Sequence, residues 1–395
     1  MSDLPTLLRW FDDGRLVRPS SAVPNTVALV RALASLNDAR DGPLDDQAQR
    51  IATAIGEADH HVFILADGLG MNLLESQPAG AFLRPHVAME LQAVFPSTTA
   101  AAITSIATGL WPAEHAVPAW WTYLPDHGVT ATILPFIERF SQRPLQELGV
   151  RPDDALPAQV TLPRFTSDVC AYMPRTIAGS TYTRYFRGGT ACRAYDGLGR
   201  AVEAIADRIR SATRRTYSYL YIPSIDAAEH LFGVASHQAR EALEAVDRAV
   251  ARLAELVATR ARIVLSADHG LLDVPRERVH IARRDDDLMR HLAAPPYGEP
   301  RVPMFTVRDG CAEAFAACFR RQYGETFALL TVDEADELRL FGPEPLAPET
   351  RRRIGGFLAL CANPDVLVYE PPDEIMRGYH AGLTAEEMRI PLVIR

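Results

Sequence analysis

Lysine is absent from this chain of 395 residues, and the 41 residues that count as lysine or arginine are all arginine. The absence excludes a Walker A lysine, a lysine Schiff base and a lysine that clamps a phosphate group. Functions that depend on any of these three are therefore ruled out.

Cysteine and long apolar runs are also scarce. The five cysteines are scattered, form no CxxC pair and leave one residue over, so reduced, mostly buried thiols are expected. No apolar stretch reaches the roughly 18 residues that a membrane span needs. The first residues include acids where a signal peptide would carry a basic segment and a long apolar run. These absences predict a cytoplasmic protein without a membrane segment.

Long runs of one charge are missing as well, although the net charge is −9. A nucleic-acid-binding protein would carry a basic face, so we expect no nucleic acid polymer as partner. Small phosphorylated substrates remain compatible with this charge, because metal ions can supply local positive charge. The hydrophobic fraction of 48% allows a sizeable core, in one large α/β domain with insertions or in two domains.

The stretch 95–109 combines a proline, small hydroxyl residues and alanines, with apolar residues at helical spacing. We expect a loop that leads into a helix, with Thr99 at or near the N-cap, a start at about Ala100 and a stop at Gly109. A hydroxyl there lies beside the free N–H groups of the helix, where a phosphate group can bind. Most threonines at an N-cap only cap the helix, so a catalytic role for Thr99 depends on the other motifs of the chain.

Aspartate and histidine recur just past the ends of expected strands. Apolar runs at 61–66, 216–222 and 262–267 indicate buried strands, and each is followed by such residues. In a parallel α/β sheet, ligands bind at the carboxyl ends of the strands. With Thr99 and a late Gly-Tyr-His-Ala-Gly segment, the set comprises Asp67, Thr99, Asp226, His230, Asp268, His269 and His380.

These oxygen and nitrogen donors suit two divalent cations of the zinc type. Two metals about 4 Å apart can hold an attacking and a leaving oxygen on either side of phosphorus. Coordination would also lower the pKa of a threonine hydroxyl, which could then attack without a histidine base. Taken singly, the same residues also fit a turn, a helix cap or an exposed surface position.

Other elements follow from periodicity. Residues 236–259 space apolar side chains as an amphipathic helix that packs on a sheet. Residues 124–215 show no clean periodicity, and we expect an inserted segment that forms part of the active-site rim. Residues 300–370 resemble a small α+β unit. Further helices are expected at 27–36, 71–75, 199–212 and 312–323, and further strands at 302–307, 327–332, 366–369 and 390–394.

The order of these motifs resembles the alkaline phosphatase superfamily, most closely its type I phosphodiesterase/nucleotide pyrophosphatase family. The chain has D-G, then P-x-x-T before a helix ending in T-G, then D-x-x-x-H, D-H-G and G-x-H-x-G. The resemblance covers roughly residues 61–125, 217–272 and 376–395. It implies one catalytic domain over 1–395, a three-layer α/β/α sandwich with a mostly parallel central sheet and a small inserted α+β subdomain.

The resemblance also implies roles for the site residues. Thr99 would be the nucleophile; it lies ten residues before Gly109, as the family pattern requires, whereas Thr98 is out of register. Zinc is the metal expected from the family, and carboxylate-rich ligands would accept manganese. Asp67, Thr99, Asp268 and His269 would ligate one metal, and Asp226, His230 and His380 the other.

The chain departs from the family near Trp120, where an asparagine usually holds a phosphate oxygen. A backbone N–H or an arginine would have to replace that donor. Trp120, Trp121 and Tyr123 could stack a flat group, or simply pack. Alanines also replace the family's P-N-H after the nucleophile, so substrate preference does not carry over from other members.

Other branches of the superfamily fit less well. Sulfatases need a cysteine in a C-x-P-x-R motif, and Cys170 has the wrong spacing to Pro174 and Arg175. Alkaline phosphatases use a serine beside an arginine, phosphonoacetate hydrolases bind the substrate carboxylate with lysines, and cofactor-independent phosphoglycerate mutases use a serine and a large inserted domain. We therefore expect a metal-dependent hydrolase of phosphodiester or pyrophosphate bonds in small, nucleotide-type substrates. A phosphomonoesterase, a phosphotransferase and a non-catalytic metal-binding homologue remain alternatives, and the oligomeric state is open.

Overall fold

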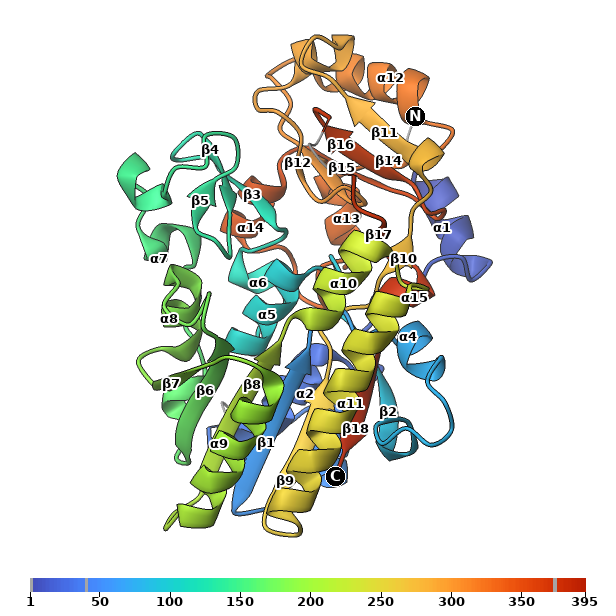
Figure 1. Ribbon diagram of the computed structural model, residues 1–395. Helices are drawn as coiled ribbons and strands as arrows, with labels where there is room; N and C mark the ends of the chain where they lie inside the picture. Colours follow the sequence, from blue (N-terminus) through green and yellow to red (C-terminus); the bar gives the residue numbers. More distant parts are fainter. Residues whose placement is uncertain (1–2, 40–41, 372–374) are drawn as a thin grey trace.

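A seven-stranded sheet forms the centre of the computed structural model, which describes residues 3–39, 42–371 and 375–395. Its strand order is β2-β18-β9-β1-β8-β6-β7 (Figure 1). The strands from β9 to β7 are parallel, whereas β18 runs antiparallel to both of its neighbours. The bounds are β1 (His60–Ala66), β2 (Val87–Gln92), β6 (Asp168–Pro174), β7 (Ala191–Tyr195), β8 (Thr216–Ile222), β9 (Arg262–Ser266) and β18 (Arg389–Ile394). This mostly parallel sheet confirms the expected fold class.

Helices cover both faces of this sheet, which completes the three layers (Figure 1). The expected amphipathic helix is α11 (His237–Val257), and its apolar stripe is buried beside α9 (Leu198–Ser211) and α10 (Ser224–Phe232). On the other face, α2 (Thr26–Leu36) packs against α3 (Asp46–Ile55) and α5 (Thr99–Thr108). Strands β1 and β8 are buried along their whole length because helices cover both of their faces.

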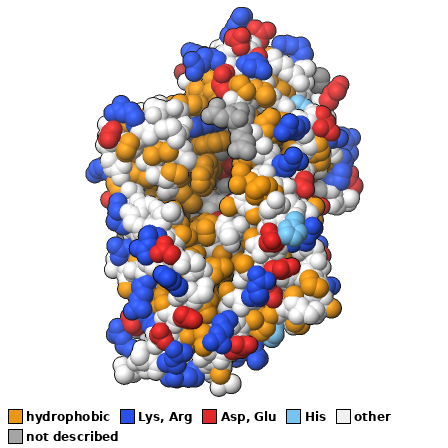
Figure 2. Space-filling model, in the orientation of Figure 1, with side chains coloured by type: hydrophobic (Ala, Val, Ile, Leu, Met, Phe, Trp, Pro, Cys, Tyr) orange, Lys and Arg blue, Asp and Glu red, His pale blue; other side chains and the backbone are white. Residues whose placement is uncertain are grey.

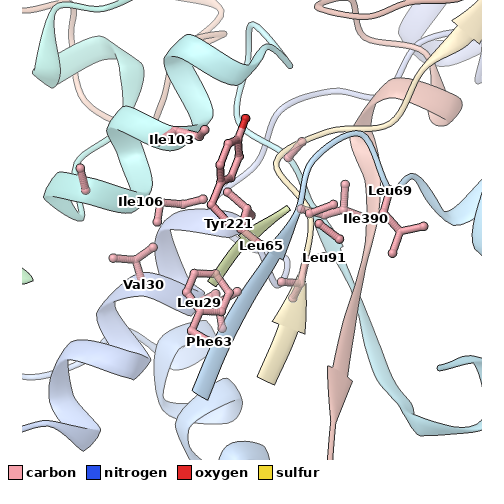
Figure 3. Packing of buried hydrophobic residues seen from close by; sticks show 14 of the residues in the cluster. Leu29, Val30, Phe63, Leu65, Leu69, Leu91, Ile103, Ile106, Tyr221 and Ile390 are labelled. Carbon is pink, nitrogen blue, oxygen red and sulfur yellow. The ribbon is translucent and has the colours of Figure 1, made fainter. Parts of the chain in front are cut away.

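The main core lies between the sheet and the second helical layer. Leu29 of α2 lies against Phe63 of β1, and Ile103 of α5 lies nearer Tyr221 (Figure 3). Tyr221 of β8 lies at the upper end of this cluster, and its hydroxyl points away from the apolar side chains (Figure 3). The apolar core therefore ends where the polar side chains at the strand ends begin.

A second seven-stranded sheet lies above the central one in the view of Figure 1. It is antiparallel, with strand order β14-β15-β13-β12-β3-β4-β5. Its strands are β3 (Trp121–Leu124), β4 (Val129–Thr132), β5 (Ile137–Glu138), β12 (Tyr297–Gly298), β13 (Pro303–Phe305), β14 (Ala328–Thr331) and β15 (Phe357–Leu360).

Shorter elements complete the fold. Two small two-stranded sheets pair β10 (Leu272–Asp273) with β17 (Gly378–Tyr379) and β11 (Val279–Ala282) with β16 (Val366–Tyr369). The remaining helices are α1 (Leu4–Asp12), α4 (Met71–Glu75), α6 (Pro112–His115), α7 (Pro152–Ala155), α8 (Thr181–Arg187), α12 (Ala312–Tyr323), α13 (Val332–Glu337), α14 (Pro348–Ile354) and α15 (Ala385–Met388). No helix in the described part of the chain is both long and apolar enough to cross a membrane.

Residues 124–215, which lack a clear sequence pattern, contribute to both sheets. Strands β4 and β5 belong to the second sheet, whereas β6 and β7 form one edge of the central sheet. Residues 300–370 supply β13, β14 and β15 of the second sheet. The division of the chain into a catalytic domain, a rim segment over 124–215 and a subdomain over 300–370 stays a prediction.

Candidate metal centre

The central strands bring the candidate ligands to one edge of the sheet. Strands β9, β1 and β8 are adjacent and parallel, and their registers place Leu65 opposite Ser266 and Ala66 opposite Ile222. The residues that follow these strands therefore meet in space. Asp67 follows β1, Asp226 lies in the first turn of α10 after β8, Asp268 and His269 follow β9, and His380 follows β17.

A glycine permits the close approach of the first two segments. Gly68 has φ +78°, a left-handed conformation that glycine adopts without strain. A Cβ on this residue would lie 2.8 Å from the Cα of Asp226, which is too close for any other side chain. The Asp67-Gly68 turn therefore approaches α10 closely only because the second residue is glycine.

Three residues form a fully buried donor group. Ligand atoms of Asp67, Asp268 and His269 all lie within 4.8 Å of one another. The Thr99 Oγ1 atom is 3.1 Å from the His269 Nε2 atom, which places the expected nucleophile directly beside this group. Asp268 also accepts hydrogen bonds from the amides of Gly68 and His269 through its Oδ1 atom. Its Oδ2 atom has no hydrogen-bond partner among the described residues.

A second donor group shares His269 with the first. Ligand atoms of Asp226, His269 and His380 also lie within 4.8 Å of one another. The His380 ring stacks on the His269 ring, with 3.9 Å between their centroids. His230 is not a member of either three-residue group, but its Nε2 atom is 3.2 Å from the Asp226 Oδ1 atom. All seven candidate residues thus converge, while their division between two metals stays a prediction.

Backbone carbonyls orient two of the imidazole rings. The His230 Nδ1 atom is 2.8 Å from the Gly378 carbonyl oxygen, and the His380 Nδ1 atom is 3.1 Å from the Ser97 carbonyl oxygen. Such contacts fix the protonated nitrogen, so the other ring nitrogen can bind a metal.

The charges at this site call for a cation. Burial and the nearby carboxylates of Asp268 and Asp226 raise the pKa of Asp67 well above its ordinary value. One oxygen on each of Asp67 and Asp268 has no hydrogen-bond partner within the described residues, and Asp226 Oδ1 has only the contact with His230. Burying several unpaired carboxylates is costly, and a bound divalent cation would compensate them. A set of carboxylate oxygens and imidazole nitrogens fits zinc, and the buried unpartnered atoms fit a metal site.

The helix that carries Thr99 starts one residue earlier than expected. Thr98 is the N-cap and makes no capping hydrogen bond through its side chain, and Thr99 is the first helical residue. Gly109 ends the helix in the left-handed conformation, with φ +71°, as expected. Thr99 thus lies among the amides of the first helical turn, which no capping side chain occupies.

Two contacts at the site were not expected from the sequence. The Tyr221 hydroxyl donates a hydrogen bond to Asp67 Oδ2, and Glu299, in the turn between β12 and β13, accepts one of 2.6 Å from the Trp120 amide. The alternation of tyrosines in β8 shows that Tyr221 shares a face with Tyr217 and Tyr219. It does not show that this face contacts Asp67. Nothing local marks Glu299, which lies 179 residues from its partner.

Glu299 affects whether the Trp120 amide can replace the asparagine that holds a phosphate oxygen in the family. Burial raises the pKa of its carboxyl to about 7, although the Thr98 hydroxyl and the Trp120 amide act in the opposite direction. The Trp120 N–H is occupied by this carboxyl, so it cannot replace the family's asparagine in this arrangement. The Arg139 Cζ atom lies 3.7 Å from the centroid of the Trp121 ring, and the Tyr123 ring stacks on the Tyr297 ring. Both Trp121 and Tyr123 therefore pack against other side chains of the protein.

A three-layer sandwich with carboxylates, imidazoles and a helix-terminal hydroxyl at the strand ends defines a phosphoric ester hydrolase of the alkaline phosphatase superfamily. The family model described as "Type I phosphodiesterase / nucleotide pyrophosphatase" matches residues 61–373. The chain therefore belongs to this family, as its motif order predicted. No sequence among the curated proteins matches the chain.

Solved structures share this fold at low sequence identity. Human ectonucleotide pyrophosphatase/phosphodiesterase 5 has a TM-score of 0.66 and 15% identity, over 85% of this chain and 87% of that one. The inactive murine protein in complex with AMP has a TM-score of 0.63 and 15% identity, over 84% and 87%. Phosphonoacetate hydrolase from Sinorhizobium meliloti 1021, in complex with phosphonoacetate, has a TM-score of 0.61 and 17% identity, over 85% and 89%.

Proposed function

We propose that this enzyme cleaves phosphodiester or pyrophosphate bonds through Thr99, at a centre that holds two divalent cations, with zinc as the expected metal. The observation that supports this most directly is the position of the Thr99 hydroxyl, 3.1 Å from the His269 Nε2 atom in the group that also contains the buried carboxylates of Asp67 and Asp268. A hydroxyl among metal-binding donors at a helix N-terminus is suited to attack phosphorus. Nucleotide-type substrates and a cytoplasmic location stay expectations from the sequence.

The family motifs imply how the donors divide between the two cations. Thr99 lies against the group of Asp67, Asp268 and His269, which would hold the first cation. Asp226, His230 and His380 would hold the second, as the family motifs imply, and backbone carbonyls orient His230 and His380. When bound, the cations would neutralise charge on the phosphoryl group and lower the pKa of a coordinated hydroxyl.

In the proposed reaction, the Thr99 Oγ1 atom attacks phosphorus in line with the departing group. The Oγ1–H proton is lost to solvent as an Oγ1–P bond forms, and the bond to the leaving oxygen breaks with its electron pair, which stays on the departing oxygen. Water then attacks the phosphothreonine, which restores the Thr99 hydroxyl and releases the phosphate monoester. The free amides at the start of α5 face the negative charge that develops on the phosphoryl oxygens.

Substitution of the nucleophile tests this proposal. Thr99→Ala should lower kcat for bis(p-nitrophenyl) phosphate on the order of a thousandfold or more, because no covalent intermediate can form. Bound metal, measured by elemental analysis, should stay near the wild-type content because the aspartates and histidines remain. Thr98→Ala is the matched control, since Thr98 is the N-cap residue, one position out of register with the family's nucleophile, and the variant should keep most activity.

Substrate preference tests the type of bond. We expect faster hydrolysis of bis(p-nitrophenyl) phosphate and p-nitrophenyl phenylphosphonate than of p-nitrophenyl phosphate, and loss of activity on chelation. A strong preference for the monoester would contradict the phosphodiesterase proposal. Two bound metals without hydrolysis of any of the three compounds would favour a non-catalytic role. Activity that survives in Thr99→Ala would refute the nucleophile.

A further inference from the structure

A cavity of about 490 Å³ opens beside the proposed nucleophile. Thr99, Asp67 and Asp226 form its polar end. Most of the remaining wall is apolar or aromatic and comes from the end of β6, from α8, from β8 and from the loop after β4, with Leu134, Met173, Ile177 and Phe186 among its side chains. Figure 2 shows a hollow on this side of the molecule, bordered mainly by hydrophobic side chains. The volume suits a small organic group attached to phosphorus.

The wall offers no positive charge to a substrate. Among the described residues that line the cavity there is no arginine or histidine, and the only charged groups are the two carboxylates at its polar end. A second anionic group on the substrate, such as a carboxylate, would be buried without a counter-charge, which is costly. The group that enters this cavity should therefore be uncharged.

Most hydroxyl groups along the wall already have partners. The Tyr221 hydroxyl donates to Asp67, and the Tyr182 and Thr104 hydroxyls are 2.8 Å apart. The Ser180 hydroxyl donates to the Thr183 hydroxyl at 3.1 Å. A nucleoside exposes many polar atoms on its base and ribose, and this wall would leave most of them unpaired. An alkyl or aryl group suits it better.

Tyr219 carries the one buried hydroxyl of this wall, in the described part of the chain, that has no hydrogen-bond partner. Its side chain is 1% exposed, and its hydroxyl has no hydrogen-bond partner within the part of the chain that the structure describes. Phe186 and Phe63 hold its ring, with centroids 4.7 and 5.8 Å away. Tyr219 lies two residues before Tyr221 on β8, so it is about 7 Å deeper along the strand. A buried hydroxyl without a partner is unfavourable unless a bound group supplies one.

We propose that this cavity binds an uncharged, mainly apolar alkyl or aryl group of the substrate, and that Tyr219 selects groups bearing a hydrogen-bonding oxygen. The proposal rests on the proposed function, since it names the substrate class of the same site. It distinguishes this enzyme from a nucleotide-selective one, because the preferred group is neither charged nor rich in polar atoms.

Competitive inhibition by phosphonates tests the apolar preference, because each inhibitor carries a single organic group. Inhibition constants are measured on the metal-loaded enzyme with bis(p-nitrophenyl) phosphate as substrate. Hexylphosphonate should bind at least about tenfold more tightly than methylphosphonate, through the added apolar contact. 5-Carboxypentylphosphonate, with a chain of the same length, should lose this gain, and AMP should bind more weakly than hexylphosphonate. Equal constants for hexyl and methyl, or tighter binding of AMP, would overturn the proposal.

The role of Tyr219 is tested with a pair of aryl ligands. Tyr219→Phe should weaken binding of 4-acetylphenylphosphonate about five- to tenfold and leave that of 4-ethylphenylphosphonate unchanged. The thermal stability of the ligand-free variant should not fall, because the substitution removes an unpartnered hydroxyl. Tyr217→Phe is the matched control, since Tyr217 lies on the same face of β8 but does not line this cavity. If both ligands weaken equally in Tyr219→Phe, the assignment is wrong.

The two proposals fail in different ways. If no diester is hydrolysed, the proposed function fails, and the same phosphonates are compared by calorimetric binding instead. If diesters are hydrolysed and Thr99→Ala is inactive, while the phosphonate series shows no apolar preference, only the proposal on the cavity fails.

Discussion

Single residues at the metal centre depend on partners that the motifs do not include. His230 and His380 are oriented by the carbonyls of Gly378 and Ser97, and Asp67 accepts a hydrogen bond from Tyr221. Such partners restrict a ligand to one orientation before the metal binds. The affinity of the site should therefore depend on side chains and carbonyls one contact away from the ligands.

Removal of the Tyr221 hydroxyl should test this dependence. Tyr221→Phe keeps the ring in the core but removes the donor to Asp67, so metal affinity should fall about 10- to 100-fold. The measurement is a metal titration of the chelator-treated protein, with activity recorded at each point. Tyr217→Phe, four residues before Tyr221 on the same face of β8, should leave affinity unchanged. Equal affinity in Tyr221→Phe and wild type would contradict a positioning role.

At the scale of the element, α5 is notable because each of its ten residues is buried. Ala100, Ala101 and Ala102 allow the helix to pack closely, where larger side chains would hold it away from α2 and α6. Its polar side chains are paired within the core. The Ser105 hydroxyl is 3.1 Å from the Nε2 atom of His115, a fully buried histidine of α6. The position of Thr99 is thus fixed by the packing of the whole helix.

His115 should make stability depend on pH. Burial lowers its pKa from 6.5 to about 3, so the folded protein keeps it neutral where the unfolded chain takes up a proton. Its contribution is complete above pH 6.5 and is lost as the pH falls from there toward the folded pKa, by up to about 1.4 kcal/mol per pH unit. His115→Gln should reduce this slope in urea unfolding measured at several pH values. Identical slopes in the two proteins would contradict the assignment.

At the scale of the whole molecule, the second sheet closes the site from above. The turn between β12 and β13 supplies Glu299, which contacts the Trp120 amide, and Arg301, which contacts Glu387. The Arg301 and Glu387 side chains are fully buried and joined by two hydrogen bonds of 2.5 and 3.0 Å. Glu387 also accepts hydrogen bonds from the amides of Gly382 and Thr384. This pair therefore links the second sheet to the loop that carries His380.

Breaking this link should destabilise the protein strongly. Glu387→Ala leaves the Arg301 guanidinium buried without its counter-charge, which should cost about 3–5 kcal/mol of unfolding free energy. The measurement is chemical denaturation of the metal-free protein. Arg389→Ala, which breaks the half-exposed pair with Glu90, is the control and should cost less than about 1 kcal/mol. Similar losses of unfolding free energy in both variants would contradict a larger stabilising role for the buried pair.

The sequence by itself determined the local elements and the set of candidate ligands. Strands such as β8 and helices such as α11 follow from periodicity, which depends on neighbouring residues alone. Asp67, Asp226 and Asp268 could be named because each follows shortly after an apolar run, and such ends meet in a parallel sheet. The motif order was then enough to indicate the family.

Only the tertiary structure decided which distant groups meet. The Gly68 amide and Asp268 are 200 residues apart, and Glu299 meets the Trp120 amide, 179 residues away, because β12 pairs with β3 in the second sheet. The membership of β6 and β7 in the central sheet, and the unpartnered Tyr219 hydroxyl in its cavity, are likewise products of strand order and packing. These contacts join segments far apart in the chain, so no local pattern of residues records them.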